Sequence, residues 1–217
     1  AVVGVGFALG TIMIGIMVGV SRRRALSRLP MRLLGYFALL GVAFMMIEIP
    51  TIQRFTVYLG RPVYSLSLVL FSLLLSSGMG SLWSSRWSGL SLSRRVRAVF
   101  VALLLVVLIH PTLSAVVIAQ TLRWPLGARI VVTLGLTALL GFWMGMPFPT
   151  GIRWVGSRHP GTVPWAWAVN GAASVIGSAL ATGVAIHIGF RLTALVAALL
   201  YGIAGALLYA AMAGHEP

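Results

Sequence analysis

The stretch AVFVALLLVVLIHPTLSAVVIA (98–119) contains no Arg, Lys, Asp or Glu. A helix of roughly 20 apolar residues crosses a bilayer core about 30 Å thick, so this segment is long enough to span a membrane. Similar apolar runs recur along the chain. We place the spans near residues 1–20, 32–50, 63–83, 98–119, 130–148, 165–188 and 192–212. The sequence therefore predicts an all-α, polytopic membrane bundle of about seven transmembrane helices in a single domain, 1–217.

The composition of the 217-residue chain agrees with a membrane domain. Hydrophobic residues make up 59% and charged residues 8%, and the mean hydropathy of +1.03 is far above that of water-soluble domains. The absence of cysteine excludes disulfides and thiolate chemistry. The net charge of +14 arises from 16 arginines against two acids, Glu48 and Glu216. These arginines lie between apolar runs, which favours contacts with anionic lipids over nucleic-acid binding.

The distribution of arginine predicts a topology. The connections 22–28, 86–97 and 150–159, together with Arg32, hold 11 arginines on one side of the bundle. The opposite side holds five, which are Arg54, Arg61, Arg123, Arg129 and Arg191. The positive-inside rule then places the N-terminus outside and the C-terminus in the cytoplasm. Because the chain begins at Ala1, we expect either the remainder of a longer polypeptide or removal of a short leader.

Small residues that recur at every fourth position predict where helices pack, because close approach drives helix association in lipid. The sixth predicted span carries Ala173, Gly177 and Ala181, and the seventh carries Ala198, Gly202 and Ala206. We expect these two faces to touch each other. The third and fifth spans have similar stripes of Ser, Thr and Gly, which we interpret as packing seams in preference to a ligand path.

Glu48 is the most unusual residue inside an apolar run, because a carboxylate is costly in lipid and requires a partner. It precedes Pro50 by two positions, and we expect this proline to break the helix and begin an amphipathic segment at 51–61. Arg54 or Arg61 could then fold back to form an ion pair. The alternative is a proton-binding or cation-binding site at Glu48.

Two further polar residues lie within predicted spans. His110 precedes Pro111, which frees the carbonyl of Val107 and bends the helix, so His110 either caps this defect or relays protons. Asn170 is the only asparagine in the chain. Its amide either cross-links two helices or contacts a ligand.

The sequence gives no indication of a catalytic, cofactor-binding or metal site. The four histidines fall in separate elements and there is no Asp, so the usual ligand clusters for a metal are missing. No HExxH, GxSxG or P-loop pattern occurs, and GVGFALG (4–10) lacks the spacing and context of a dinucleotide fingerprint. We therefore predict no catalytic residue, cofactor or metal ligand in this chain.

Three stretches carry a family resemblance: FALLGVAFMMIEIPTIQRFTVYLGRPVYSLSLVLFSLLLSSGMGS (37–81), MGMPFPTGIRW (144–154) and PWAWAVNGAASVIGS (164–178). They resemble the membrane region of bacterial spermidine-synthase-like fusion proteins. In such proteins a Rossmann-type domain similar to polyamine aminopropyltransferases is joined to transporter-like helices. The resemblance implies a location in the bacterial inner membrane. This chain looks like the helices alone and has no segment onto which an aminopropyltransferase residue could be transferred.

Three functional hypotheses follow. The first is a non-catalytic membrane domain that anchors or serves an enzyme domain and handles a polyamine-like cation, as the resemblance implies. The second is a scaffold or assembly subunit of a larger membrane complex, for which the small-residue seams are typical. The third is an independent secondary transporter, although the sequence shows no convincing internal repeat.

Overall fold

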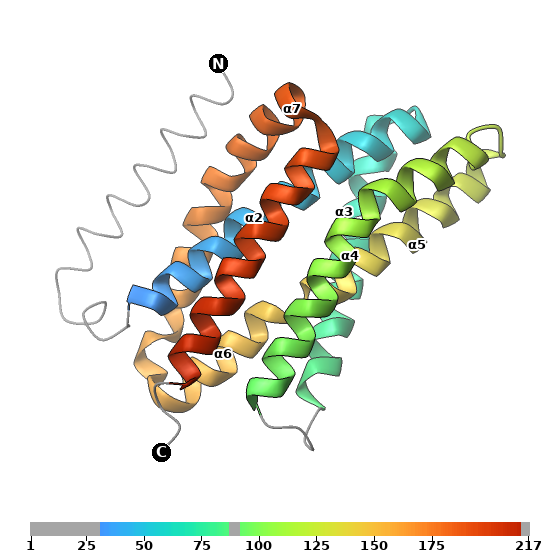
Figure 1. Ribbon diagram of the computed structural model, residues 1–217. Coiled ribbons are helices and arrows are strands. Elements are labelled where there is room, and N and C mark those ends of the chain that lie inside the picture. Colours follow the sequence, from blue (N-terminus) through green and yellow to red (C-terminus); the bar gives the residue numbers. More distant parts are fainter. Residues whose placement is uncertain (1–30, 87–91, 214–217) are drawn as a thin grey trace.

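The computed structural model describes residues 31–86 and 92–213, and this part of the chain is helical without any strand (Figure 1). The elements are α2 (Met31–Leu59), α3 (Pro62–Ser85), α4 (Leu92–Thr121), α5 (Leu126–Met144), α6 (Pro147–Arg158), the 3₁₀ helix η2 (Pro160–Thr162) and α7 (Val163–Ala213). The all-α class predicted from the apolar runs is confirmed for these residues.

Five helices of the described part are long and apolar enough to cross a membrane. They are Met31–Leu59, Pro62–Ser85, Ser93–Thr121, Leu126–Arg158 and Pro160–Ala213. The predicted count of seven is not confirmed, and the span expected near 1–20 lies outside the described residues. The sixth and seventh expected spans both fall within α7. They meet at Gly189, whose φ of 80° and ψ of 169° are not helical, and Figure 1 shows the chain reversing there.

Pro50 does not end its helix, so the predicted break and the separate segment 51–61 are wrong. Helix α2 continues through Pro50 to Leu59. Prolines are tolerated in membrane helices because neighbouring helices and hydroxyl side chains satisfy the freed backbone groups. Pro50 frees the carbonyl of Met46, and the adjacent hydroxyl of Thr51 donates to the next carbonyl along the helix, that of Ile47, at 2.6 Å. Helix α4 passes through Pro111 in the same way.

Helix α2 is the centre of the bundle, and its largest interface is with α7. Its aromatic side chains form much of the core: Tyr36, Phe37, Phe55 and Tyr58 are almost fully buried. The rings of Tyr36 and Phe37 pack edge to face at 4.9 Å between centroids. A helix that is apolar around most of its surface is expected at such a central position.

Helices α3 and α5 form the second large interface, and glycine permits it. A methyl group added at Gly80 would overlap the backbone of Phe142, and one added at Gly145 would lie 2.6 Å from the carbonyl carbon of Ser77. The two backbones therefore touch directly. These glycines belong to the seams that the sequence predicted in the third and fifth spans.

The predicted contact between the small faces of the sixth and seventh spans is wrong. Gly177 faces α2, where an added methyl group would lie 2.8 Å from the Cα atom of Val42. Ala173 and Ala181 are buried on the same part of α7. Gly202 has no neighbour within 4 Å of an added methyl group, and Ala206 is exposed. Helix α2 therefore supplies the surface against which Gly177 packs.

The connection expected between the fifth and sixth spans is itself a helix. Pro147 occupies the first turn of α6, where its missing N–H costs nothing. Thr150, Gly151, Trp154 and Val155 are buried, and Gly151 rests against the ring of Tyr36. Arg153 and Arg158 are exposed on the other face. An amphipathic helix of this kind lies along a membrane interface.

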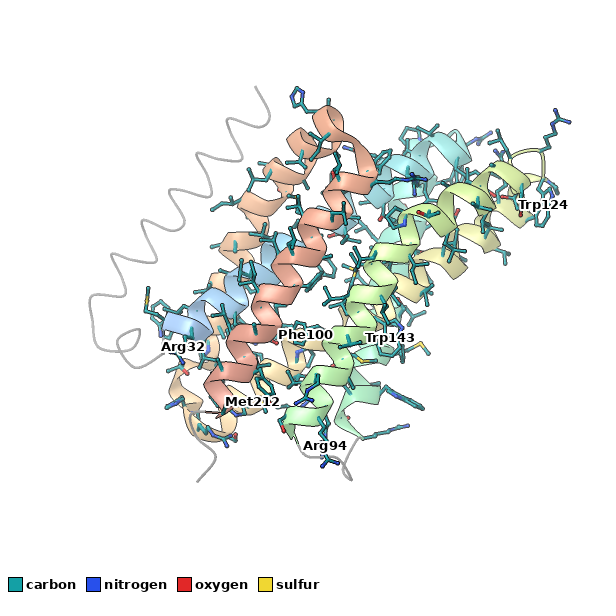
Figure 2. The ribbon with its side chains drawn as sticks, viewed as in Figure 1. Arg32, Arg94, Phe100, Trp124, Trp143 and Met212 are labelled. Atoms are coloured by element: carbon teal, nitrogen blue, oxygen red, sulfur yellow. The ribbon has the colours of Figure 1, made fainter. Side chains whose placement is uncertain are left out.

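Two arginines of the group expected on one side of the membrane lie towards the same end of the bundle. Figure 2 shows Arg32 and Arg94, with Met212, towards one end and Trp124 at the opposite end. This arrangement follows from the alternation of helix directions between α2 and the end of α7 (Figure 1). The arginines expected at 22–28 lie outside the described residues.

Candidate functional site

Arg54 and Arg61 do not pair with Glu48. The Nη1 atom of Arg54 donates to the carbonyl of Pro111 at 2.7 Å and to the hydroxyl of Ser114, and its guanidinium lies over the ring of Phe190 at 5.2 Å. Arg54 therefore joins α2 to the proline bend of α4 and to the second half of α7. Arg61 is exposed and stacks on Tyr64 at 5.5 Å. The ion pair expected at the proline break is absent because α2 remains helical.

His110 is buried beside the same bend, with 6% of its surface exposed. Its Nε2 atom has no hydrogen-bond partner in the described part of the chain. The ring lies near the backbone of Leu136 and near the guanidinium of Arg54. The carbonyl of His110 accepts a hydrogen bond from the hydroxyl of Ser114 at 2.7 Å, which is not the Val107 carbonyl that Pro111 frees.

Glu48 is buried on α2 with 8% of its surface exposed. Among residues 31–86 and 92–213 it makes no hydrogen bond or ion pair. It interacts electrostatically with the phenol of Tyr201, which comes from the second half of α7. A buried acid without a cation is costly in an apolar environment, so this carboxyl group is available to a ligand or a proton.

Asn170 lies where α7 crosses α2. Its Nδ2 atom donates to the carbonyl of Phe37 at 3.0 Å, and Gly41 makes room for the backbone of Asn170. The amide thus joins two helices that are far apart in sequence. Its Oδ1 atom has no partner within the described ranges and remains able to accept a hydrogen bond.

A cleft of about 480 Å³ lies beside Asn170. Its walls come from α2, α3, the α5–α6 junction and α7. Leu74, Gly78 and Trp167 on its edge are exposed, so a molecule can enter from outside the bundle. The lining residues are Leu40, Phe44, Met45, Leu74, Ser77, Gly78, Ser81, Met144, Gly145, Pro147, Phe148, Pro149, Trp167, Asn170, Ser174 and Tyr201.

The chemistry of this cleft differs from that of the chain as a whole. None of its lining residues is basic, although the protein contains 16 arginines. Four are aromatic, and the rings of Phe148 and Trp167 pack edge to face at 4.5 Å. Three serines and Asn170 supply hydrogen-bond acceptors. Tyr201 lines the cleft and also interacts electrostatically with Glu48, which does not itself line the cleft.

The sequence indicated Asn170 and Glu48 but not the aromatic residues that complete the cleft. Phe44, Phe148 and Tyr201 come from three different helices, so no local pattern could group them. The prolines of the α5–α6 junction were a usable signal, because they end α5 and turn α6 sideways at the wall of the cleft.

Comparisons with protein-family models, with curated proteins and with solved structures give no match. The resemblance to spermidine-synthase-like fusion proteins therefore stays a prediction. No group of three or more metal-ligating side chains occurs in the part of the chain that the structure describes.

Proposed function

We propose that this chain is a non-catalytic membrane domain whose lateral cleft holds an amine-bearing, partly apolar molecule. The observation that carries the proposal is the composition of the cleft, which offers aromatic faces and oxygen acceptors without a basic side chain. A cation over an aromatic face gains about 0.5 to 2 kcal/mol, and ammonium groups need acceptors only. A basic surface elsewhere on the chain would repel the same ligand.

Glu48 supports this proposal through its electrostatic interaction with Tyr201, a residue that lines the cleft. It is the only acid in the described part of the chain, and it has no ion pair there. An ammonium group in the cleft would supply the opposite charge that Glu48 lacks. A polyamine-like cation has this chemistry, which agrees with the family that the sequence resembles. In that setting the domain anchors or serves a soluble aminopropyltransferase-like enzyme domain in the inner membrane.

Trp167→Ala is expected to weaken the binding of dodecylamine or spermidine by about 2- to 30-fold, the range of one cation–π contact. Calorimetric titration of the purified protein in detergent measures this change. Trp124→Ala is the matched control, because Trp124 is also about half exposed but lies at the other end of the bundle (Figure 2). Glu48→Gln should weaken the binding of both amines, whereas dodecanol should bind to all variants with the same affinity. Equal affinity of Trp167→Ala and wild type for the amines would refute the amine site.

We also propose that the arginine-rich end faces the cytoplasm. The chain has no cysteine, so single cysteines can be introduced without a background. Cysteines at Arg94 and Arg158 should resist a membrane-impermeant thiol reagent in intact cells, and a cysteine at Arg123 should react. The opposite labelling pattern would invert the topology.

The scaffold alternative makes a different prediction. A scaffold subunit should co-purify stably with other membrane proteins, and its cleft should bind no amine. The mass of the native polypeptide further tests the enzyme-domain proposal, because a soluble domain in the same polypeptide would raise it well above 23.1 kDa.

A further inference from the structure

A second cavity lies beside Arg54, towards the opposite end of α2 from the amine cleft. Its volume is about 30 Å³, which exceeds the roughly 10–15 Å³ that a single water requires. Residues of α2, α4, α5 and the second half of α7 line it. Its polar side chains are those of Arg54, His110 and Thr51. The hydroxyl of Thr51 is already engaged with the carbonyl of Ile47.

The charge around this cavity is positive, and no acidic side chain in the described ranges forms an ion pair with it. Arg54 forms no ion pair there, and the charge that acts on it electrostatically is that of another arginine, Arg191. Only Nη1 of its guanidinium has hydrogen-bond partners among the described residues. A partly buried guanidinium in an apolar bundle requires an opposite charge or water.

His110 provides the independent observation. Its side chain is more than nine-tenths buried, lines the same cavity, and has an Nε2 atom without a partner in the described part of the chain. A buried polar atom in this state destabilises the fold unless a ligand or water satisfies it. A neutral imidazole with its proton on Nε2 can donate one hydrogen bond from that atom.

We propose that this cavity binds a compact monovalent anion, with chloride as the ligand, between Arg54 and His110. The guanidinium supplies the charge and the free N–H groups, and Nε2 of His110 supplies a further donor. The remainder of the wall, including Pro50, Pro111 and Phe190, is apolar. The anion would join α2, α4 and α7 where both prolines interrupt the backbone ladder. This inference does not depend on the amine cleft.

The test compares thermal unfolding of the purified protein in sodium chloride, sodium bromide and sodium gluconate at equal ionic strength. Chloride and bromide should raise the unfolding midpoint by about 3 to 6 °C over gluconate at a tenfold excess over the dissociation constant. His110→Phe and Arg54→Gln should abolish this difference. Arg61→Gln is the matched control, because Arg61 is an exposed arginine near the same end of α2, and it should retain the full difference.

Bromide soaked into crystals of the wild-type protein gives a second measurement that does not depend on variants that fold. An anomalous peak within about 3.5 Å of both Arg54 and His110 is expected. Wild-type stability that is equal in chloride and gluconate, together with the absence of such a peak, would overturn the proposal. So would loss of the chloride effect in Arg61→Gln, because the effect would then arise from general surface charge.

Discussion

Replacing Gly80 by Ala is expected to prevent stable packing of α3 against α5, although it adds a single methyl group. That group would overlap the carbonyl oxygen of Phe142 and lie 2.9 Å from its carbonyl carbon. The obstacle is backbone, so neither a rotamer change nor a small side-chain shift relieves it, and the two helices must separate. We expect a loss of about 3 kcal/mol, the upper end of the usual cost of overpacking. Unfolding of the purified protein by a detergent titration measures this loss.

Gly78→Ala is the control for Gly80→Ala. It lies two residues earlier on the same helix, and an added methyl group would meet nothing within 4 Å. Both variants gain the same helix propensity, so the difference between them isolates the contact with α5. Equal unfolding of the two variants would show that α3 and α5 do not approach as closely as the structure places them.

The apolar runs predicted the helices of the described part well because hydrophobic length is a local property. The runs at 63–83, 98–119 and 130–148 each match a helix to within several residues. The effect of proline was harder to predict. Whether Pro50 breaks α2 depends on the helices packed around it, and these are tertiary features.

Candidate residues were easier to identify than their partners. Glu48, Arg54, His110 and Asn170 all stand out because a polar group in an apolar run is costly. Their partners are distant in sequence: Arg54 reaches Pro111 on α4, and Asn170 reaches Phe37 on α2. No spacing rule links residues more than 50 positions apart. The ion pair expected between Glu48 and Arg54 failed for a different reason, because α2 continues through Pro50.

The packing of α7 shows why a stripe of small residues predicts which face of a helix packs closely but not which helix it packs against. A stripe indicates that some surface approaches closely, and it does not say which helix provides that surface. Gly177 and Gly202 belong to equally regular stripes, yet α2 covers the first and nothing covers the second among the described residues. The central position of α2 is a consequence of the whole chain order and cannot be read from either stripe.

Gly177→Leu is therefore expected to abolish the folded state, while Gly202→Leu leaves it intact. At Gly177 even the first carbon of the side chain would lie 2.8 Å from the Cα atom of Val42 and 3.2 Å from the Cβ atom of Met45, so a leucine would push α7 away from α2. That interface is the largest in the bundle, and its loss removes the support for Asn170 and the cleft.

At Gly202 a leucine meets open space on the surface of α7, where an apolar side chain suits lipid. Size-exclusion profiles and unfolding midpoints of the two variants in the same detergent provide the comparison. Gly177→Leu should aggregate or elute as unfolded protein, and Gly202→Leu should elute with wild type and unfold within about 0.5 kcal/mol of it, as substitutions outside packed sites do. If Gly202→Leu instead failed to assemble, the two halves of α7 would have to touch along their small faces. Helix α2 would then not be the surface that holds the first half of α7 in place.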